Sequence, residues 1–242
     1  MKREKYLFLA LLLILLSTPQ VSYAMHIMEG FLPAGWAIFW AVVSIPFLAR
    51  GLKRINKVFK QDINAKVLLG LVGGFVFVLS ALKIPSLTGS CSHPTGVGLG
   101  AILFGPTVMT VIGTIVLLFQ ALLLAHGGIT TLGANIFSMA IVGPIVSYGI
   151  YAGLKKTNMN KGFIVFIAAT LGDLATYCVT ATQLAVVFPD GASGFIGSLG
   201  KFLSVFAVTQ LPLAVVEGIL TVIIYNLLIE YKSQGVISIE NI

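Results

Sequence analysis

Long apolar runs separated by short polar or basic stretches dominate this 242-residue chain. A helix that spans a membrane needs about 20 apolar residues, and longer runs can cross with some tilt. Six runs satisfy this requirement, at residues 33–50, 66–84, 106–125, 133–154, 162–187 and 200–229. The pattern therefore predicts an all-α integral membrane protein rather than a globule built on one buried core.

The composition supports this interpretation. Hydrophobic residues make up 57% of the chain and charged residues only 10%, whereas soluble domains carry about 25% charged residues. Such a chain lacks the polar groups that a water-facing surface requires unless lipid covers that surface. A water-soluble enzyme or binding domain is therefore excluded, and the basic loops lack the aromatic interleaving that would suggest nucleic-acid binding.

The first 24 residues have the pattern of a secretory signal peptide. Three basic residues precede an apolar run over 6–16, and small residues occupy the −3 and −1 positions at Ser22 and Ala24. The alternative is an uncleaved first membrane helix, but the apolar run is too short to span. We expect cleavage after Ala24, which leaves a membrane domain over 25–242 that begins Met25-His26.

The basic residues predict the topology. They cluster around two loops and near the C-terminus, and the positive-inside rule makes these regions cytoplasmic. A cleaved signal leaves the new N-terminus outside. Six spans would then put the C-terminus outside as well, although its basic residue belongs inside, so one crossing is missing. The Gly-rich apolar stretch 96–105 can supply it as a short or broken helix buried inside protein. We expect about seven segments, with the C-terminus inside.

All three histidines, His26, His93 and His126, fall on the predicted outer face. A single interfacial histidine is usually a polar residue that finds a hydrogen bond, but three on one face of a membrane protein favour a metal site. Cleavage would make His26 the second residue, so the free amine of Met25, the following amide nitrogen and the imidazole could chelate one ion. We expect His93 to be the fourth nitrogen donor, because its loop is non-helical and rich in small residues. Such a tetragonal site suits Ni(II), Cu(II) or constrained Co(II).

Three motifs carry a specific family resemblance: Met25 to Pro33, Gly-Ser-Cys-Ser-His-Pro-Thr-Gly over 89–96, and Ala125 to Asn135. The chain resembles CbiM, the substrate-capture component of cobalt energy-coupling-factor transporters, and the closely similar nickel protein NikM. The resemblance implies seven helices, a mature N-terminus inserted into the protein centre, and ligation by Met25, His26 and His93. It also implies a CbiQ-like coupling protein, a CbiO-like cytoplasmic ATPase and a small CbiN-like membrane subunit. Cobalt, for cobalamin biosynthesis, is favoured over nickel.

Other residues have supporting or open roles. His126, Glu29, Ser92 and Asn135 are candidates for a position behind the ligands or on the path of the ion. Asp173 and Glu217 lie within predicted spans and should face the bundle interior, in a polar network or as guides for a cation. Cys91 is interpreted as a small packing residue rather than a ligand, and Cys178 as a core residue.

The first span carries Ala37 and Ala41 with Ala34 one turn earlier, a spacing of small residues that permits close helix packing. It could serve internal packing or, as the resemblance implies, contact the coupling protein. The chain has no phosphate-binding loop of the Gly-x-x-x-x-Gly-Lys-Ser/Thr type, so ATP hydrolysis would belong to other subunits. A self-sufficient secondary transporter should show inverted repeats, and a metalloenzyme should show an open coordination position beside a base. Neither is evident, so a capture subunit is the leading hypothesis.

Overall fold

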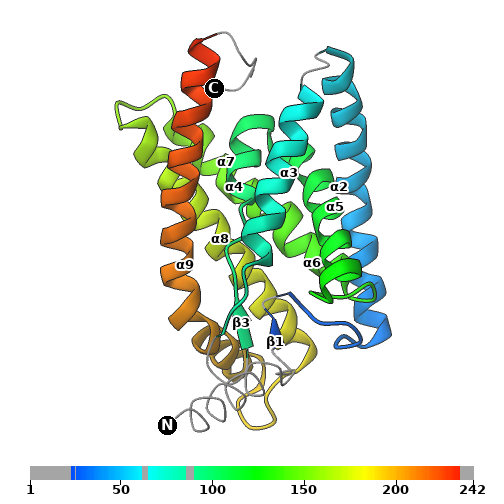
Figure 1. Ribbon diagram of the computed structural model, residues 1–242. Coiled ribbons are helices and arrows are strands. Elements are labelled where there is room, and N and C mark those ends of the chain that lie inside the picture. The colour runs from blue at the N-terminus through cyan, green and yellow to red at the C-terminus, as the bar shows by residue number, and fades with distance from the viewer. Residues whose placement is uncertain (1–22, 25, 62–64, 86–89, 235–242) are drawn as a thin grey trace, which may run out of the picture.

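The computed structural model describes residues 23–24, 26–61, 65–85 and 90–234, and most of them belong to helices (Figure 1). The helices are α2 (Ala34–Gln61), α3 (Ala65–Ala81), α4 (Val97–Phe104), α5 (Pro106–Leu124), α6 (Leu132–Asn135), the π-helical η2 (Ile136–Val142), α7 (Gly143–Leu154), α8 (Lys161–Val187) and α9 (Gly194–Ser233). Because α6, η2 and α7 are continuous, the described residues form seven helical segments. The predicted all-α fold with seven segments is confirmed.

Five of the described helical segments are long and apolar enough to cross a membrane: α2, α5, the α6–α7 run, α8 and α9, while α3 is a shorter apolar helix. Their outward faces carry large apolar side chains, such as Ile38 at 63% exposure and Ile196 at 74%. Apolar surface on this scale is rare on soluble monomers and marks contact with lipid or partners.

The short segment expected over 96–105 is α4, and the residues over 97–103 are buried. Eight helical residues extend only about 12 Å, so α4 cannot cross a bilayer alone. It packs among α5, α7 and α8, where its small residues allow close approach. A Cβ on Gly98 would lie 2.9 Å from Ala169 Cα, and one on Gly100 would lie 2.2 Å from Met109 Sδ.

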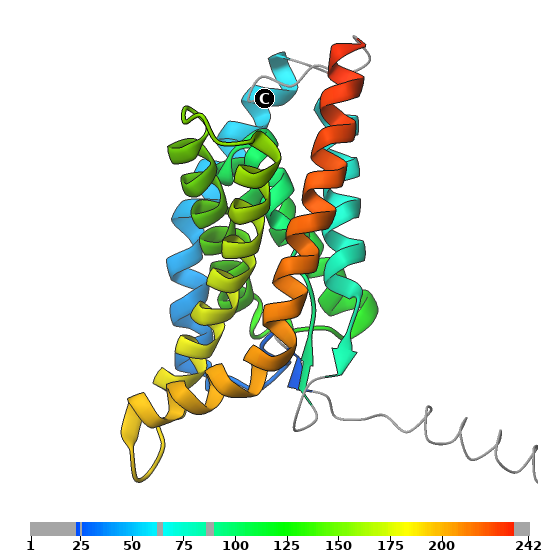
Figure 2. The same cartoon turned by 90° about the vertical axis from the view of Figure 1, so that its left-hand side faces the viewer.

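Two helices are longer than the apolar runs predicted. α2 continues to Gln61, so most basic residues expected around the first loop lie on its last turns. The hydropathy run ends at residue 50, but lysine and arginine are good helix formers and the backbone hydrogen bonds continue. α9 starts at Gly194 instead of residue 200. Figure 2 shows that its first turns run obliquely to the rest of the helix, which contains Pro212.

The interpretation of Cys178 as a core residue was wrong. The residue lies within α8 as expected, but its side chain is exposed. The helix buries Tyr177 and Ala181 instead. Because α8 is apolar on nearly every face, its sequence pattern does not show which side is turned inward. The Cys91 side chain lies outside the described ones.

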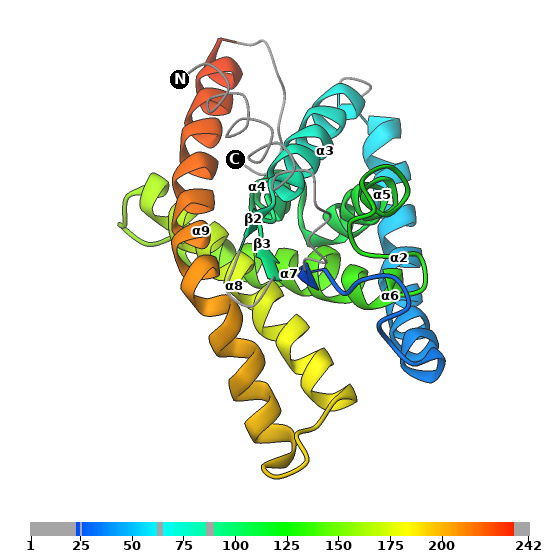
Figure 3. The same ribbon diagram turned by 60° about the horizontal axis from the view of Figure 1, so that its bottom comes forward.

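The two ends of the molecule differ in chemistry. The end of α2 with the start of α3, the α7–α8 connection and the end of α9 lie together at one end (Figure 1), and these regions carry the clustered lysines and arginines. The opposite end holds a small sheet of β1 (Tyr23–Ala24), β3 (Ser90–Ser92) and β2 (Ile84–Pro85), in that order. β1 pairs with β3 in parallel and β2 pairs with β3 antiparallel. Seen from this end, β1 and β3 lie near the centre of the bundle (Figure 3).

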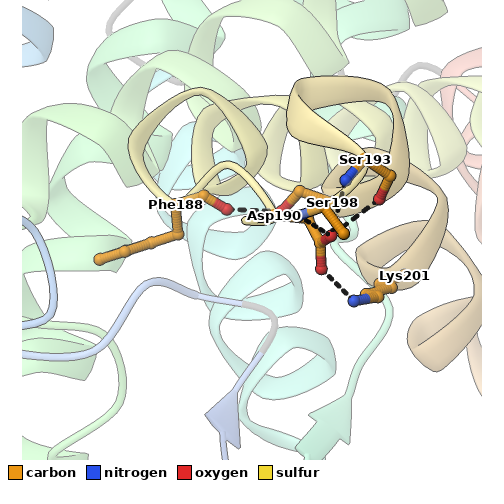
Figure 4. A network of polar contacts seen from close by, with 6 residues as sticks. Phe188, Asp190, Ser193, Ser198 and Lys201 are labelled. Atoms are coloured by element: carbon orange, nitrogen blue, oxygen red, sulfur yellow. Dashed lines mark hydrogen bonds and ion pairs between the residues drawn. The ribbon is translucent and has the colours of Figure 1, made fainter.

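The turn between α8 and α9 is fixed by Asp190 (Figure 4). Its Oδ1 accepts hydrogen bonds from the amides of Ala192 and Ser193, each at 3.0 Å, and its Oδ2 pairs with Lys201. The bond from Lys201 is the largest cause of the lowered pKa of Asp190. Ser198 Oγ donates to Phe188 O at 2.6 Å and joins the two helix ends, and the Phe188 ring contacts Phe31 at 5.1 Å. The turn therefore packs against the N-terminal segment.

Candidate metal centre

Three segments that are distant in sequence each bring one histidine to the sheet end of the bundle. His26 precedes α2, His93 follows β3, and His126 follows α5. Left-handed backbone at Ala125 (φ 45°) and Gly127 (φ 77°) surrounds His126. Glycine adopts this conformation without steric cost, and it turns the chain back after α5. The three histidine-bearing segments therefore meet at the sheet end of the bundle.

The three imidazoles form one compact cluster, in which His26, His93 and His126 each offer a ring nitrogen within 4.8 Å of the others. Their ring centroids lie 4.5 to 4.9 Å apart, and each side chain is at most 3% exposed. Neutral imidazole nitrogens are common protein ligands of divalent transition metals, so the three rings could hold one ion together.

Hydrogen bonds indicate which nitrogens could act as ligands. His93 Nδ1 lies 3.1 Å from the Pro94 carbonyl, and a carbonyl only accepts, so Nδ1 carries the hydrogen and Nε2 carries the lone pair. That lone pair faces His26 Nδ1 at 2.9 Å. His26 Nε2 and both ring nitrogens of His126 have no partner at hydrogen-bond distance. Buried nitrogens are normally paired, so this cluster has spare capacity to bind an ion.

The electrostatic environment keeps the histidines neutral. Burial lowers the pKa of His93 to about 4. Burial and then the neighbouring His93 lower the pKa of His126 to about 2, and burial holds the pKa of His26 well below its ordinary value. A metal binds only the deprotonated imidazole. At neutral pH all three rings are therefore in the form that ligates.

Asn135 and Glu29 attach the N-terminal segment to the turn after α5. Asn135 Oδ1 accepts from Ile27 N at 2.8 Å while its Nδ2 donates to Ile27 O at 3.0 Å, next to His26. The exposed Glu29 carboxylate accepts from Ile129 N and from Thr130 Oγ1, and the bond from Thr130 is the largest cause of its lowered pKa. Both candidates thus lie beside the cluster and hold its backbone. The Glu29 carboxylate is not part of the group of described side chains that could hold an ion.

The loop that carries His93 is fixed to α8 and α9 by buried polar contacts. Gln210 Nε2 donates to the His93 carbonyl at 3.2 Å and to Asp173 Oδ2 at 2.6 Å. Glu217 accepts from the amide of Thr95 at 2.5 Å and from its hydroxyl at 3.0 Å. The expectation that both acids face the interior is confirmed, since Asp173 is 1% exposed and Glu217 is 0% exposed.

Ser92 was among the residues predicted to support the site, whereas Gln210 was not. Ser92 Oγ lies 2.7 Å from Thr209 Oγ1 and joins β3 to α9. Gln210 was not among the predicted residues, although it lies seven positions before Glu217 and so shares its helix face. That spacing could have placed Gln210 on the buried face of α9, but it does not predict the contact with His93. Met25 and the expected amine lie outside the described residues.

Comparison with known proteins identifies the family. A family model described as cobalt uptake substrate-specific transmembrane region, CbiM, matches residues 26–234. The chain belongs to the CbiM family. The cobalt transport protein CbiM of Clostridioides difficile is 62% identical over 229 residues, which cover 95% of this chain and 92% of that protein. The CbiM of Thermosipho melanesiensis is 62% identical over 230 residues, which cover 95% and 97%.

Solved structures agree with this assignment. A truncated transition metal transporter superposes with a TM-score of 0.76 at 28% identity, and the match covers 85% of this chain and 99% of that one. A second transition metal transporter gives 0.76 at 27% identity, covering 86% and 94%. The chain is therefore a multi-pass membrane protein of a CbiM transport family, as the sequence motifs indicated.

Proposed function

We propose that this chain is the capture subunit of an ATP-driven importer, which binds Co(II) at the outer face of the cell membrane for cobalamin biosynthesis. The observation that supports this most strongly is the convergence of three buried, neutral imidazoles within 4.8 Å at one end of the bundle. The curated CbiM relatives are named as cobalt transport proteins. Nickel is the alternative cargo, because both ions accept the same donors.

The proposed ligands are the amine of Met25, the amide and imidazole of His26, and the imidazole of His93. Cleavage after Ala24 would create that amine. The pairing of Ala24 with Cys91 supports the idea that the new terminus would start beside the loop of His93. The proposed orientation puts the N-terminus and the histidines outside and the C-terminus in the cytoplasm, since the basic regions lie together at the opposite end.

ATP hydrolysis is assigned to partner subunits: a CbiO-like ATPase, with a CbiQ-like coupling protein and a CbiN-like small membrane protein. The test is cobalt uptake by cells that express this chain alone and cells that express it with the partners. We expect energy-dependent uptake only with the partners. Equal uptake by the chain alone would identify a self-sufficient secondary transporter.

The pH dependence of binding should separate an amine chelate from an all-imidazole site. Because the histidine pKa values are lowered, these rings release almost no protons when a metal binds above pH 6. An α-amine with an ordinary pKa near 8 and a backbone amide would each have to release one proton. We expect cobalt affinity to fall by up to about a hundredfold per pH unit as pH drops from 8 to 6. Calorimetry in buffers with different ionisation enthalpies counts the protons, and a count near zero contradicts amine and amide ligation.

Replacing His126 with alanine should weaken cobalt binding by roughly 10- to 100-fold without abolishing it, the range expected for a residue behind the ligands. The side chain contacts His26 and His93 at ring distances below 5 Å, so its loss loosens their packing. Titration of the purified variant measures the affinity. A loss as complete as that of His93→Ala would make His126 a direct ligand.

Ala37 and Ala41 are the proposed contact for the coupling protein. Ala34, Ala37 and Ala41 line a shallow groove of about 370 Å³ together with Gly30, Leu32, Ile38 and Thr130. Ala41 also takes part in packing within the chain, because Gly133 lies close to its backbone. A Cβ added to Gly133 would lie 2.5 Å from Ala41 Cα. A partner helix could pack closely in the remaining groove.

Replacing both Ala37 and Ala41 with leucine should leave cobalt binding by the isolated chain intact and reduce ATP-dependent uptake several-fold, because the added bulk fills the groove. The matched control is Val42→Leu with Ile45→Leu, because both residues are exposed on the same helix and do not line the groove. Co-purification with the coupling protein measures assembly. Unchanged assembly of the alanine variant would assign these residues to internal packing alone.

A further inference from the structure

A basic pocket lies at the end of the molecule opposite the histidine cluster. It has a volume of about 510 Å³ and opens between the end of α7, the start of α8 and the last turns of α9. Its lining residues are Tyr151, Lys155, Lys161, Ile164, Tyr225, Ile229, Lys232 and Ser233. Lys155 directly follows α7, whereas Lys161 lies on α8 and Lys232 on α9, so cationic side chains come from three segments. No carboxylate is among the described residues of the lining. The pocket is suited to an anion.

The inner wall of the pocket offers hydrogen-bond donors as well as charge. Tyr151 and Tyr225 are 5% and 1% exposed, and their hydroxyl oxygens lie 3.3 Å apart. One hydroxyl donates to the other, so the second hydrogen of the pair is left to donate elsewhere. Lys155 Nζ lies 5.8 Å from the ring centroid of Tyr151, so its charge lies over the ring of that tyrosine. Ammonium and hydroxyl donors together match the oxygens of a phosphate group.

The position of the pocket indicates where the phosphate comes from. All three helices carry large apolar side chains on their exposed faces, for example Ile145 on α7, Phe163 on α8 and Leu227 on α9. The pocket lies within the last turns of these helices, where a bilayer places its headgroups. Basic pockets between spanning helices at this level bind anionic headgroups. Acyl chains could then cover the apolar helix faces, a contact that soluble phosphate cannot make.

We propose that this pocket binds the phosphate-bearing headgroup of an anionic phospholipid, which holds the ends of α7, α8 and α9 together. The site is separate from the histidine cluster, and its occupancy does not depend on the cargo. If the lipid site proves wrong, the proposed cobalt function is unaffected. If the cobalt function proves wrong, the lipid site is equally unaffected.

The experiment is native mass spectrometry and thermal unfolding of the purified full chain in detergent, titrated with phosphatidylglycerol, phosphatidylcholine or inorganic phosphate. The test variant replaces Lys155, Lys161 and Lys232 with glutamine. The matched control replaces Lys53, Lys57 and Lys60, which lie on α2 at the same end and are equally charged. A second variant replaces the three pocket lysines with arginine, which keeps the charge.

We expect one phosphatidylglycerol to be retained and to raise the unfolding temperature of the wild type, the arginine variant and the α2 control. The glutamine variant should bind it about tenfold more weakly or worse. Equal binding by the glutamine variant and the α2 control would overturn the proposal, as would equal protection by phosphatidylcholine. Protection by inorganic phosphate equal to that by phosphatidylglycerol would also overturn it, and would assign the pocket to a soluble anion.

Discussion

Replacing His93 with alanine should abolish high-affinity cobalt binding while the helical bundle remains folded. The imidazole is fully buried and its Nε2 lies 2.9 Å from His26 Nδ1, at the centre of the cluster. Its loop is held through backbone groups by Gln210 and Glu217, so removing the side chain leaves those contacts in place. Residues behind a ligand cost 10- to 100-fold in affinity, and loss of a ligand should exceed about 100-fold.

The measurement is a cobalt titration of purified wild type and variant, followed by thermal unfolding with and without the ion. Bound metal stabilises the wild type by mass action, and the variant should lose this shift. Gln183→Ala is the matched control, because Gln183 is buried and donates to Ala134 O at 3.1 Å. It should reduce stability and keep the affinity. A folded His93→Ala protein that still binds one ion with unchanged affinity would exclude His93 as a ligand.

Much of the fold could be predicted from the number of membrane crossings that the basic residues require and from local glycine and proline signals. The distribution of basic residues required a seventh segment, and the Gly-rich stretch between Pro94 and Pro106 predicted where it lies. α4 confirms this, with left-handed Gly96 before it and Gly105 after it. These signals are local, because glycine and proline mark helix ends wherever the chain runs.

The features that could not be predicted depend on the packing of distant segments. His126 was ranked behind the other histidines, although the structure brings all three rings into one cluster. Gln210 contacts His93 across 117 positions, and no local pattern reports such a contact. Cys178 was placed wrongly for a related reason, since an apolar helix in lipid does not show which face is buried. The role of His126 relative to His93 stays a prediction.

Inserting one alanine between Ala24 and Met25 should destroy the site although every side chain is retained. After processing, the amine would lie one residue farther from the His26 amide, and a longer ring would replace the tight chelate. The added residue also needs space beside a buried side chain, since His26 is 3% exposed and the adjacent Ile27 backbone is fixed by Asn135. We expect a loss of affinity well above about 100-fold.

An N-terminal change of equal size away from the chelate provides the control. An alanine inserted between residues 17 and 18 lies within the predicted signal peptide and should be removed with it, so the mature chain is unchanged. Blocking cleavage should have the same effect as the insertion before Met25, because the amine becomes part of a peptide bond. If both insertions behave alike, the position of the mature N-terminus does not determine binding.

The most direct measurement combines N-terminal sequencing with cobalt titration of the purified protein carrying the inserted alanine before Met25. We expect a mature chain that begins Ala-Met-His and binds no cobalt at concentrations that saturate the wild type at one ion per chain. A chain confirmed to begin Ala-Met-His that binds one ion with the affinity and spectrum of the wild type would contradict the amino-terminal chelate. The side chains of His26, His93 and His126 would then be the complete set of ligands.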